Sequence, residues 1–212
     1  SSALQRLVLD IHAGGGVVGA VCHGPAVFAR IRDAEGKAFA RGRAMTGFTD
    51  EEEALFGKRW VPQFPFLLES ELREEGARFG EGPMMLPYVA RDGRVVTGQN
   101  PYSVVESVEA MVALLGREPA PREMWKDERS MHLLRQAAGG DTAPLARALA
   151  TGRDQLDIPL VAIWGYYRSL ENPRDGALLR QAIEIMDLVQ PHFDQPELAK
   201  AISDARTALA SL

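Results

Sequence analysis

The residues that most constrain the fold lie between positions 17 and 25. Val17 to Val21 form a short apolar run without polar alternation, which is typical of a strand buried on both faces of a parallel sheet. Cys22 follows at the carboxyl end of this run. Pro25 stands where the first turn of a helix accepts a residue that lacks an N–H. A strand, a tight turn and a helix in this order predict an α/β fold.

The turn carries residue types that point to chemistry. Small residues surround Cys22, with Gly19 and Ala20 before it and Gly24 after it, as a nucleophile elbow requires. Such a turn directs backbone N–H groups at developing negative charge. His23 and the dipole of the following helix both favour a thiolate. The alternative is a small buried cysteine beside a turn histidine, but the strand and helix on either side favour the nucleophile.

Helical and strand patterns alternate through the first half of the chain. Glycine runs or single glycines end two of the helical segments, and Asp92-Gly93 predicts a tight hairpin turn. The periodicity predicts helices at 3–13, 25–31, 51–56, 65–75 and 103–115, strands at 17–21 and 43–48, and a hairpin at 89–97.

The character of the sequence changes after a segment with two prolines and mixed charge at residues 116–122, which predicts a linker. Everything beyond it has a helical pattern, in pieces near 123–138, 142–151, 157–170, 176–190 and 196–211. We therefore predict an α/β domain at residues 1–118 and a helical extension, or small helical bundle, at residues 119–212.

Composition argues against several classes of partner. The formal net charge is −5 and the pI is near 5.5, so we expect no nucleic-acid partner. No apolar run approaches the roughly 20 residues that span a bilayer, and no secretion signal is recognisable, which by default predicts a cytoplasmic protein without a membrane partner. A single cysteine excludes an internal disulfide. His12, His132 and His192 lack metal-ligand spacing, so we expect no metal and no organic cofactor.

The segment Ala20-Val21-Cys22-His23-Gly24-Pro25-Ala26 resembles the active-site signature of the ThiJ/PfpI family, within the glutamine-amidotransferase-like superfamily. Three further blocks in the same order resemble its glyoxalase III-like branch, at residues 45–53, 65–69 and 92–101. The resemblance extends from residue 3 to about residue 116. It implies a parallel-sheet, flavodoxin-like α/β domain, followed here by an all-α C-terminal extension.

This resemblance implies roles for individual residues. Cys22 would attack an aldehyde carbonyl, His23 would shuttle protons, and Glu53 would orient His23. The same stretch offers other carboxylates for the last role, namely Asp50, Glu51 and Glu52. Glu53 is alternatively an exposed carboxylate at the start of a helix.

Gly24 and Asn100 are candidates for an oxyanion site or substrate pocket, with Thr97 and Gln99 near the pocket mouth. A Gly-Gln-Asn-Pro run is also typical of a turn that leaves a strand. The family's other strands, its Gly-Gly oxyanion segment and a glutamate that contacts the nucleophile have no counterpart in the printed sequence. We therefore regard the α/β domain as N-terminally incomplete and expect upstream residues or another chain to supply them.

The resulting hypothesis is a lyase or hydrolase of glyoxalase III type. It would convert methylglyoxal or a related 2-oxoaldehyde to a hydroxy acid, using Cys22 and no glutathione. Amidase, peptidase or deglycase-like hydrolysis is a close alternative, because an elbow thiolate attacks many carbonyls. A holdase chaperone, a redox-sensing stress protein or a degenerate family member kept for assembly are others. For the helical extension we expect packing, binding of a partner, or self-association into a homo-oligomer.

Overall fold

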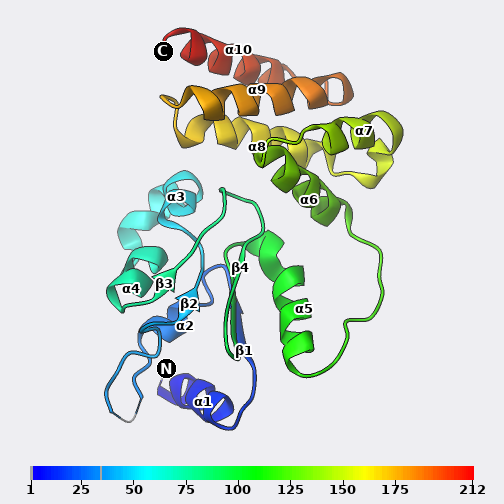
Figure 1. Ribbon diagram of the computed structural model, residues 1–212. Helices are drawn as coiled ribbons and strands as arrows, with labels where there is room; N and C mark the ends of the chain where they lie inside the picture. Colours follow the sequence, from blue (N-terminus) through cyan, green and yellow to red (C-terminus); the bar gives the residue numbers. More distant parts are fainter. Residues whose placement is uncertain (1, 34) are drawn as a thin grey trace. The chain divides into compact units, whose positions relative to one another are not determined.

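The computed structural model describes residues 2–33 and 35–212 and divides into two compact units (Figure 1). The first unit ends at Pro121 and the second begins at Arg122. This boundary falls within the segment expected to be a linker. Ser1, with which the expected α/β domain begins, lies outside the described residues. That residues 1–118 and 119–212 form separate domains stays a prediction.

The first unit contains a three-stranded mixed sheet in the order β1-β5-β4. β1 (Val18–Val21) runs parallel to β5 (Val95–Gly98), and β4 (Val89–Asp92) pairs with β5 in the antiparallel sense. The predicted hairpin is confirmed, with Gly93 in the turn at a φ of 57°. A second, parallel pair joins β2 (Ala44–Met45) to β3 (Arg78–Phe79).

Helices accompany these strands, and together they make the α/β fold that the sequence predicted (Figure 1). They are α1 (Ser2–Ala13), α2 (Ala26–Ala29), α3 (Asp50–Glu52), the π-helix η1 (Glu53–Gly57), the 3₁₀ helix η2 (Lys58–Gln63), α4 (Leu68–Glu74), the 3₁₀ helix η3 (Pro101–Ser103) and α5 (Val104–Leu114).

Two elements near Cys22 are shorter than predicted. The helix expected at 25–31 is the single turn α2, and beyond it Arg32 forms an antiparallel bridge with Ala38. A helix of one turn has a weak dipole, so the field at Cys22 depends mainly on nearby side chains. The strand expected at 43–48 pairs only over β2, because the Thr46 N–H then turns to the Thr97 hydroxyl at 2.8 Å.

β5, rather than β1, is the strand buried on both faces. All four residues of β5 are buried, whereas in β1 only Val18 is buried and Gly19 is exposed. The expectation that residues 17–21 form a doubly covered strand is therefore wrong, because β1 is the end strand of the described sheet. The apolar core of this unit includes Phe28, Ile31, Met45, Leu72 and Val95.

α5 packs on the sheet through Ser107 against Gly98 of β5 and through Met111 against Gly19 of β1. Val104 and Val108 are exposed, while Ser107 is buried. A methyl group added to Gly98 of β5 would lie 2.6 Å from the Ser107 hydroxyl and 2.8 Å from Ser103 Cβ. Glycine at positions 98 and 19 therefore leaves the room that this side of α5 needs to approach the strands.

The second unit is all-α, and its five helices agree with those expected from the sequence. They are α6 (Lys126–Ala138), α7 (Ala143–Thr151), α8 (Ile158–Glu171), α9 (Gly176–Val189) and α10 (Pro196–Ala210), with short 3₁₀ helices η4 (Arg153–Gln155) and η5 (Gln190–His192). The N-cap residues of α8 and α9, Asp157 and Asp175, accept hydrogen bonds from the first turn of each helix.

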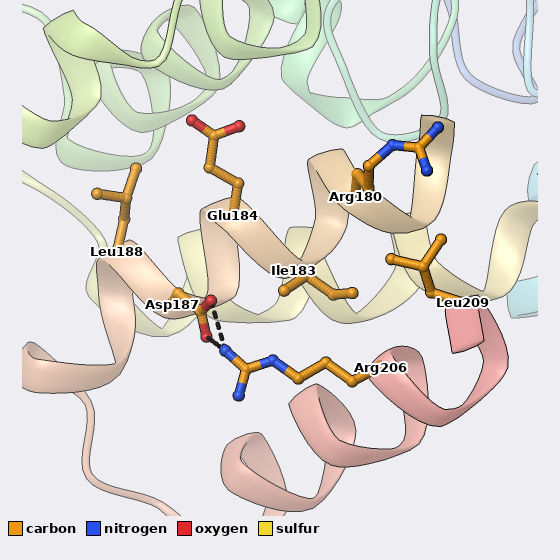
Figure 2. A pocket seen from close by; sticks show the side chains of 7 residues that line it. All are labelled: Arg180, Ile183, Glu184, Asp187, Leu188, Arg206 and Leu209. Carbon is orange, nitrogen blue, oxygen red and sulfur yellow. Dashed lines mark hydrogen bonds and ion pairs between the residues drawn. The ribbon is translucent and has the colours of Figure 1, made fainter. Parts of the chain in front are cut away.

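A surface groove of about 500 Å³ lies between α9 and α10 of this unit (Figure 2). Arg206 of α10 reaches across it to Asp187 of α9, with 2.8 Å between Nη2 and Oδ2.

Self-association through the helical unit stays a prediction. None of the helices in the described part of the chain combines the length and the apolar character needed to cross a membrane.

The approach at Gly98 generates a prediction about stability. In Gly98→Ala the new methyl group overlaps Ser103 and Ser107, so the free energy of opening of β1 and β5 falls by about 1–3 kcal/mol. Native-state hydrogen exchange at the amides of these strands measures it. The control is Gly152→Ala, whose methyl group meets no atom closer than 3.8 Å. Unchanged exchange in β5 would contradict the packing described.

Candidate active site

Cys22 occupies a strained turn between β1 and α2. Its φ is 61°, in the left-handed region that residues other than glycine rarely adopt. Two neighbouring segments hold this conformation, because the Cys22 N–H donates to the Gly98 carbonyl and its carbonyl accepts from the Phe48 N–H, both at 2.9 Å. Such strain persists only where the surroundings enforce it. The turn therefore has the geometry that the nucleophile-elbow hypothesis requires.

The Cys22 side chain meets the imidazole of His23, and the imidazole meets Glu53. Cys22 Sγ lies 3.3 Å from His23 Nδ1, and the opposite ring nitrogen, Nε2, forms a short contact with Glu53 Oε1. The sulfur is partly buried. The Glu53 side chain is only 3% exposed, whereas that of His23 is 53% exposed. A thiol, an imidazole and a carboxylate thus stand in the order of a catalytic triad.

The pKa of His23 is raised from 6.5 to about 9. The largest cause is its hydrogen bond with Cys22; burial opposes the shift, and the hydrogen bond with Glu53 adds to it. At neutral pH the ring is therefore an imidazolium, in which both nitrogens are donors. It donates to the sulfur on one side and to the carboxylate on the other.

The structure selects among the carboxylates that the sequence left open. Of the four, Glu53 is the one described in contact with His23, and the alternative of an exposed carboxylate is wrong. Asp50 accepts hydrogen bonds from Ser70 instead, Glu51 is exposed, and Glu52 is buried with other partners.

Local backbone geometry explains the direction of Glu53. Thr49 and Glu52 form a capping box that starts α3, and Glu53 then begins the π-helical turn η1. Turns of this kind occur frequently at functional sites. Gly57 ends the turn, and a methyl group there would overlap Glu53 Oε2. The absence of a side chain at Gly57 thus leaves room for the carboxylate.

Gly24, a candidate for the oxyanion site or substrate pocket, has its backbone N–H engaged within the turn. Its backbone N–H donates to the Val21 carbonyl at 2.9 Å and so closes the turn around Cys22. A Cβ at this position would lie 3.0 Å from the same carbonyl oxygen. The glycine is therefore needed for the tightness of the turn.

Asn100 also has a structural place instead of the expected pocket position. It is 1% exposed, and its amide donates to Glu52 Oε1 at 3.0 Å and to the Leu86 carbonyl at 2.8 Å. Thr97 and Gln99 are fully buried as well, so neither lies at a pocket mouth. The side chains of Gln99 and Asn100 hold the segment after β5 in place, whereas the Thr97 hydroxyl binds the Thr46 N–H.

Two aromatic rings beside His23 were not identified from the sequence as site residues. The Phe48 ring lies 4.7 Å from the imidazole, centroid to centroid, and the Phe64 ring lies 6.3 Å away. Phe48 belongs to one of the family-like blocks, so its position could have been suspected. Phe64 follows the irregular segment η2, where no periodicity indicates a direction. Together these rings form an apolar side to the site.

Within the described residues, no group of three His, Cys, Asp or Glu side chains is arranged to hold a metal ion.

Known proteins match about half of the chain, although no family model matches it. Glyoxalase 3 of Candida albicans is 38% identical over 115 residues, 52% of this chain and 48% of that protein. The glutathione-independent glyoxalase HSP31 of Saccharomyces cerevisiae is 38% identical over 117 residues, 51% and 49% of the two chains. About half of this chain is homologous to glyoxalases of the ThiJ/PfpI family. The resemblance stated from the four sequence blocks is thereby confirmed.

A solved structure is similar to about the same share of the chain. The Rapid Encystment Protein of 24 kDa from Francisella tularensis superimposes with a TM-score of 0.52 at 35% identity, over 54% of this chain and 50% of that one. The chain spans about half the length of the curated glyoxalases that it matches.

The contacts of His23 generate a prediction. In Glu53→Gln the carboxylate charge is lost, so the pKa of His23 falls from about 9 toward 6.5. NMR titration of the His23 ring measures it. Glu51→Gln removes the same charge from an exposed neighbour and leaves the titration unchanged. An unchanged His23 titration in Glu53→Gln would show that the two side chains are not paired in solution.

Proposed function

We propose that this chain carries the chemistry of a cysteine-dependent, glutathione-independent glyoxalase, which converts methylglyoxal or a related 2-oxoaldehyde to a hydroxy acid. The observation that supports this most is the Cys22–His23–Glu53 arrangement. It occurs in a chain of which about half is homologous to enzymes of that name. Cys22 is the nucleophile, His23 the acid and base, and Glu53 the residue that orients His23.

The reaction begins with addition to the aldehyde. The Cys22 sulfur attacks as the thiolate that is paired with the His23 imidazolium. It forms a bond to the aldehyde carbon, and the electron pair of the C=O bond moves to oxygen. His23, an imidazolium with a pKa of about 9, gives this oxygen its Nδ1 proton. The product is a hemithioacetal on Cys22, and His23 is left neutral and able to act as a base.

A proton then moves between the two carbons of the substrate. Neutral His23 removes the proton from the former aldehyde carbon and passes it to the ketone oxygen, which gives an enediol. His23 then takes the hydroxyl proton of the sulfur-bearing carbon and delivers it to the former ketone carbon. The former aldehyde carbon is oxidised and the ketone carbon is reduced, so the step balances without an external oxidant. The result is a 2-hydroxyacyl thioester on Cys22.

Hydrolysis completes the cycle. Water adds to the thioester with His23 as general base, the carbon–sulfur bond breaks, and the hydroxy acid leaves Cys22 free. Glu53 stabilises the imidazolium each time it forms and keeps the ring in line with the sulfur. Its burial makes this contact stronger than it would be in water.

The first developing oxyanion requires a donor. The Gly24 N–H already binds the Val21 carbonyl. The backbone N–H of His23 directly follows the nucleophile, and no hydrogen bond of this group is described. In other nucleophile elbows the N–H after the nucleophile fills this role. We assign it to His23 as part of the proposal.

The test is lactate formation from methylglyoxal by the purified protein without glutathione. Cys22→Ala and His23→Ala are expected to reduce the rate by at least about 10³-fold, because removing either member disables the same unit. His132→Ala, which changes a histidine of the helical unit, leaves the rate unchanged. Lactate production that persists in Cys22→Ala, or no lactate from the unmodified protein, would overturn the proposal.

A further inference from the structure

A second buried carboxylate, Glu52, lies next to Glu53 and has no part in the mechanism above. Its side chain is fully buried. One oxygen, Oε1, accepts from the Met85 N–H at 2.9 Å and from the Asn100 amide at 3.0 Å. The other, Oε2, accepts from the Thr49 N–H at 3.2 Å and from its hydroxyl at 3.3 Å. Each carboxylate oxygen therefore has two donors.

These four hydrogen bonds connect three segments that are distant in the sequence. Thr49 is the N-cap of α3, and Met85 lies in a turn with a φ of 64°. Asn100 comes two residues after the end of β5. The last residue of β5, Gly98, holds the Cys22 N–H through its carbonyl. A short series of contacts thus runs from the helix start at Glu52 to the strand end that fixes Cys22.

The burial of Glu52 is costly for a residue that only caps a helix. Burial raises the pKa of this carboxyl above its usual value, against the effect of its hydrogen bonds with Met85, Asn100 and Thr49. No described ion pair includes Glu52, so hydrogen bonds alone offset the loss of hydration. A three-residue helix does not require this, because the Thr49 hydroxyl already accepts the Glu52 N–H at 3.1 Å.

We propose that Glu52 is a positioning residue for the candidate active site. By binding Asn100 and Met85 it fixes the point at which the π-helical turn begins, and so holds the Glu53 carboxylate against His23. The catalytic consequence rests on the proposed glyoxalase function, whereas the effect on the geometry of His23 does not.

The close fit around Glu53 shows why its position needs such support. The π-helical turn starts at Glu53 itself, so a change in the start of the turn rotates this side chain away from His23. On the far side, the carboxylate lies so close to Gly57 that a methyl group on this glycine would overlap Glu53 Oε2. Glu53 therefore has one direction that satisfies both neighbours, and Glu52 anchors the backbone just before it.

The first experiment uses the full chain with Glu52→Gln. The amide nitrogen that replaces one carboxylate oxygen faces hydrogen-bond donors, so the tether is broken with little change in volume. The pKa of His23 is raised by its contacts with Cys22 and Glu53, and we expect it to fall from about 9 toward 6.5 as Glu53 moves. The matched control is Glu51→Gln, which removes the same charge one residue earlier at an exposed position and leaves the His23 titration unchanged.

A second variant decides the matter where Glu52→Gln does not fold. Asn100→Ala removes one of the four donors to Glu52, and we expect a smaller fall of the His23 pKa in the same direction. Circular dichroism establishes that each variant is folded. A folded Glu52→Gln, or failing that a folded Asn100→Ala, with an unchanged His23 titration would overturn the proposal.

Kinetics with methylglyoxal provide the catalytic test. A positioning residue does not touch the substrate, so Glu52→Gln is expected to lower kcat on the order of 10- to 100-fold with nearly unchanged KM, while Glu51→Gln retains full kcat. An equal loss of kcat in both variants would assign the effect to charge and overturn the positioning role. If the unmodified protein forms no lactate, the proposed function fails, and the His23 titration still decides the role of Glu52.

Discussion

The candidate site depends on the hydrogen bonds of one imidazole. His23 contacts the Cys22 sulfur through Nδ1 and the buried Glu53 carboxylate through Nε2. Each contact favours the protonated ring, which explains a pKa of about 9 although burial acts in the opposite direction. Without Glu53 the ring would be free to turn, and without Cys22 it would lose the larger of its two favourable contacts. The remaining structure serves to bring these three side chains together.

β5 organises the backbone around this imidazole. Its Gly98 carbonyl binds the Cys22 N–H, its Thr97 hydroxyl accepts from Thr46, and Asn100 directly beyond it binds Glu52. Three segments that carry site residues are thus attached to one buried strand. A small change in β5 therefore propagates to the sulfur and to the carboxylate at once, which links the packing of the sheet to the chemistry.

The sequence predicted those features that depend on neighbouring residues and missed those that depend on distant ones. Cys22 and His23 are adjacent in the chain, so a strand followed by a tight turn was enough to bring them together. Periodicity did not distinguish Glu53 from three other acidic residues. The family resemblance pointed to it, and its contact with His23 depends on the π-helical turn. Asn100 was placed in a pocket because its partner Glu52 lies 48 residues away. The burial of β1 was overestimated because apolar runs do not show whether a strand lies at the end of a sheet.

The most direct test of this account is the protonation state of the His23 ring, measured by ¹⁵N NMR from neutral pH upward. We predict that both ring nitrogens carry a proton at neutral pH and that one proton is lost only near pH 9, since the raised pKa preserves the imidazolium up to that point. A neutral imidazole at neutral pH would contradict the pairing of His23 with Cys22 and Glu53.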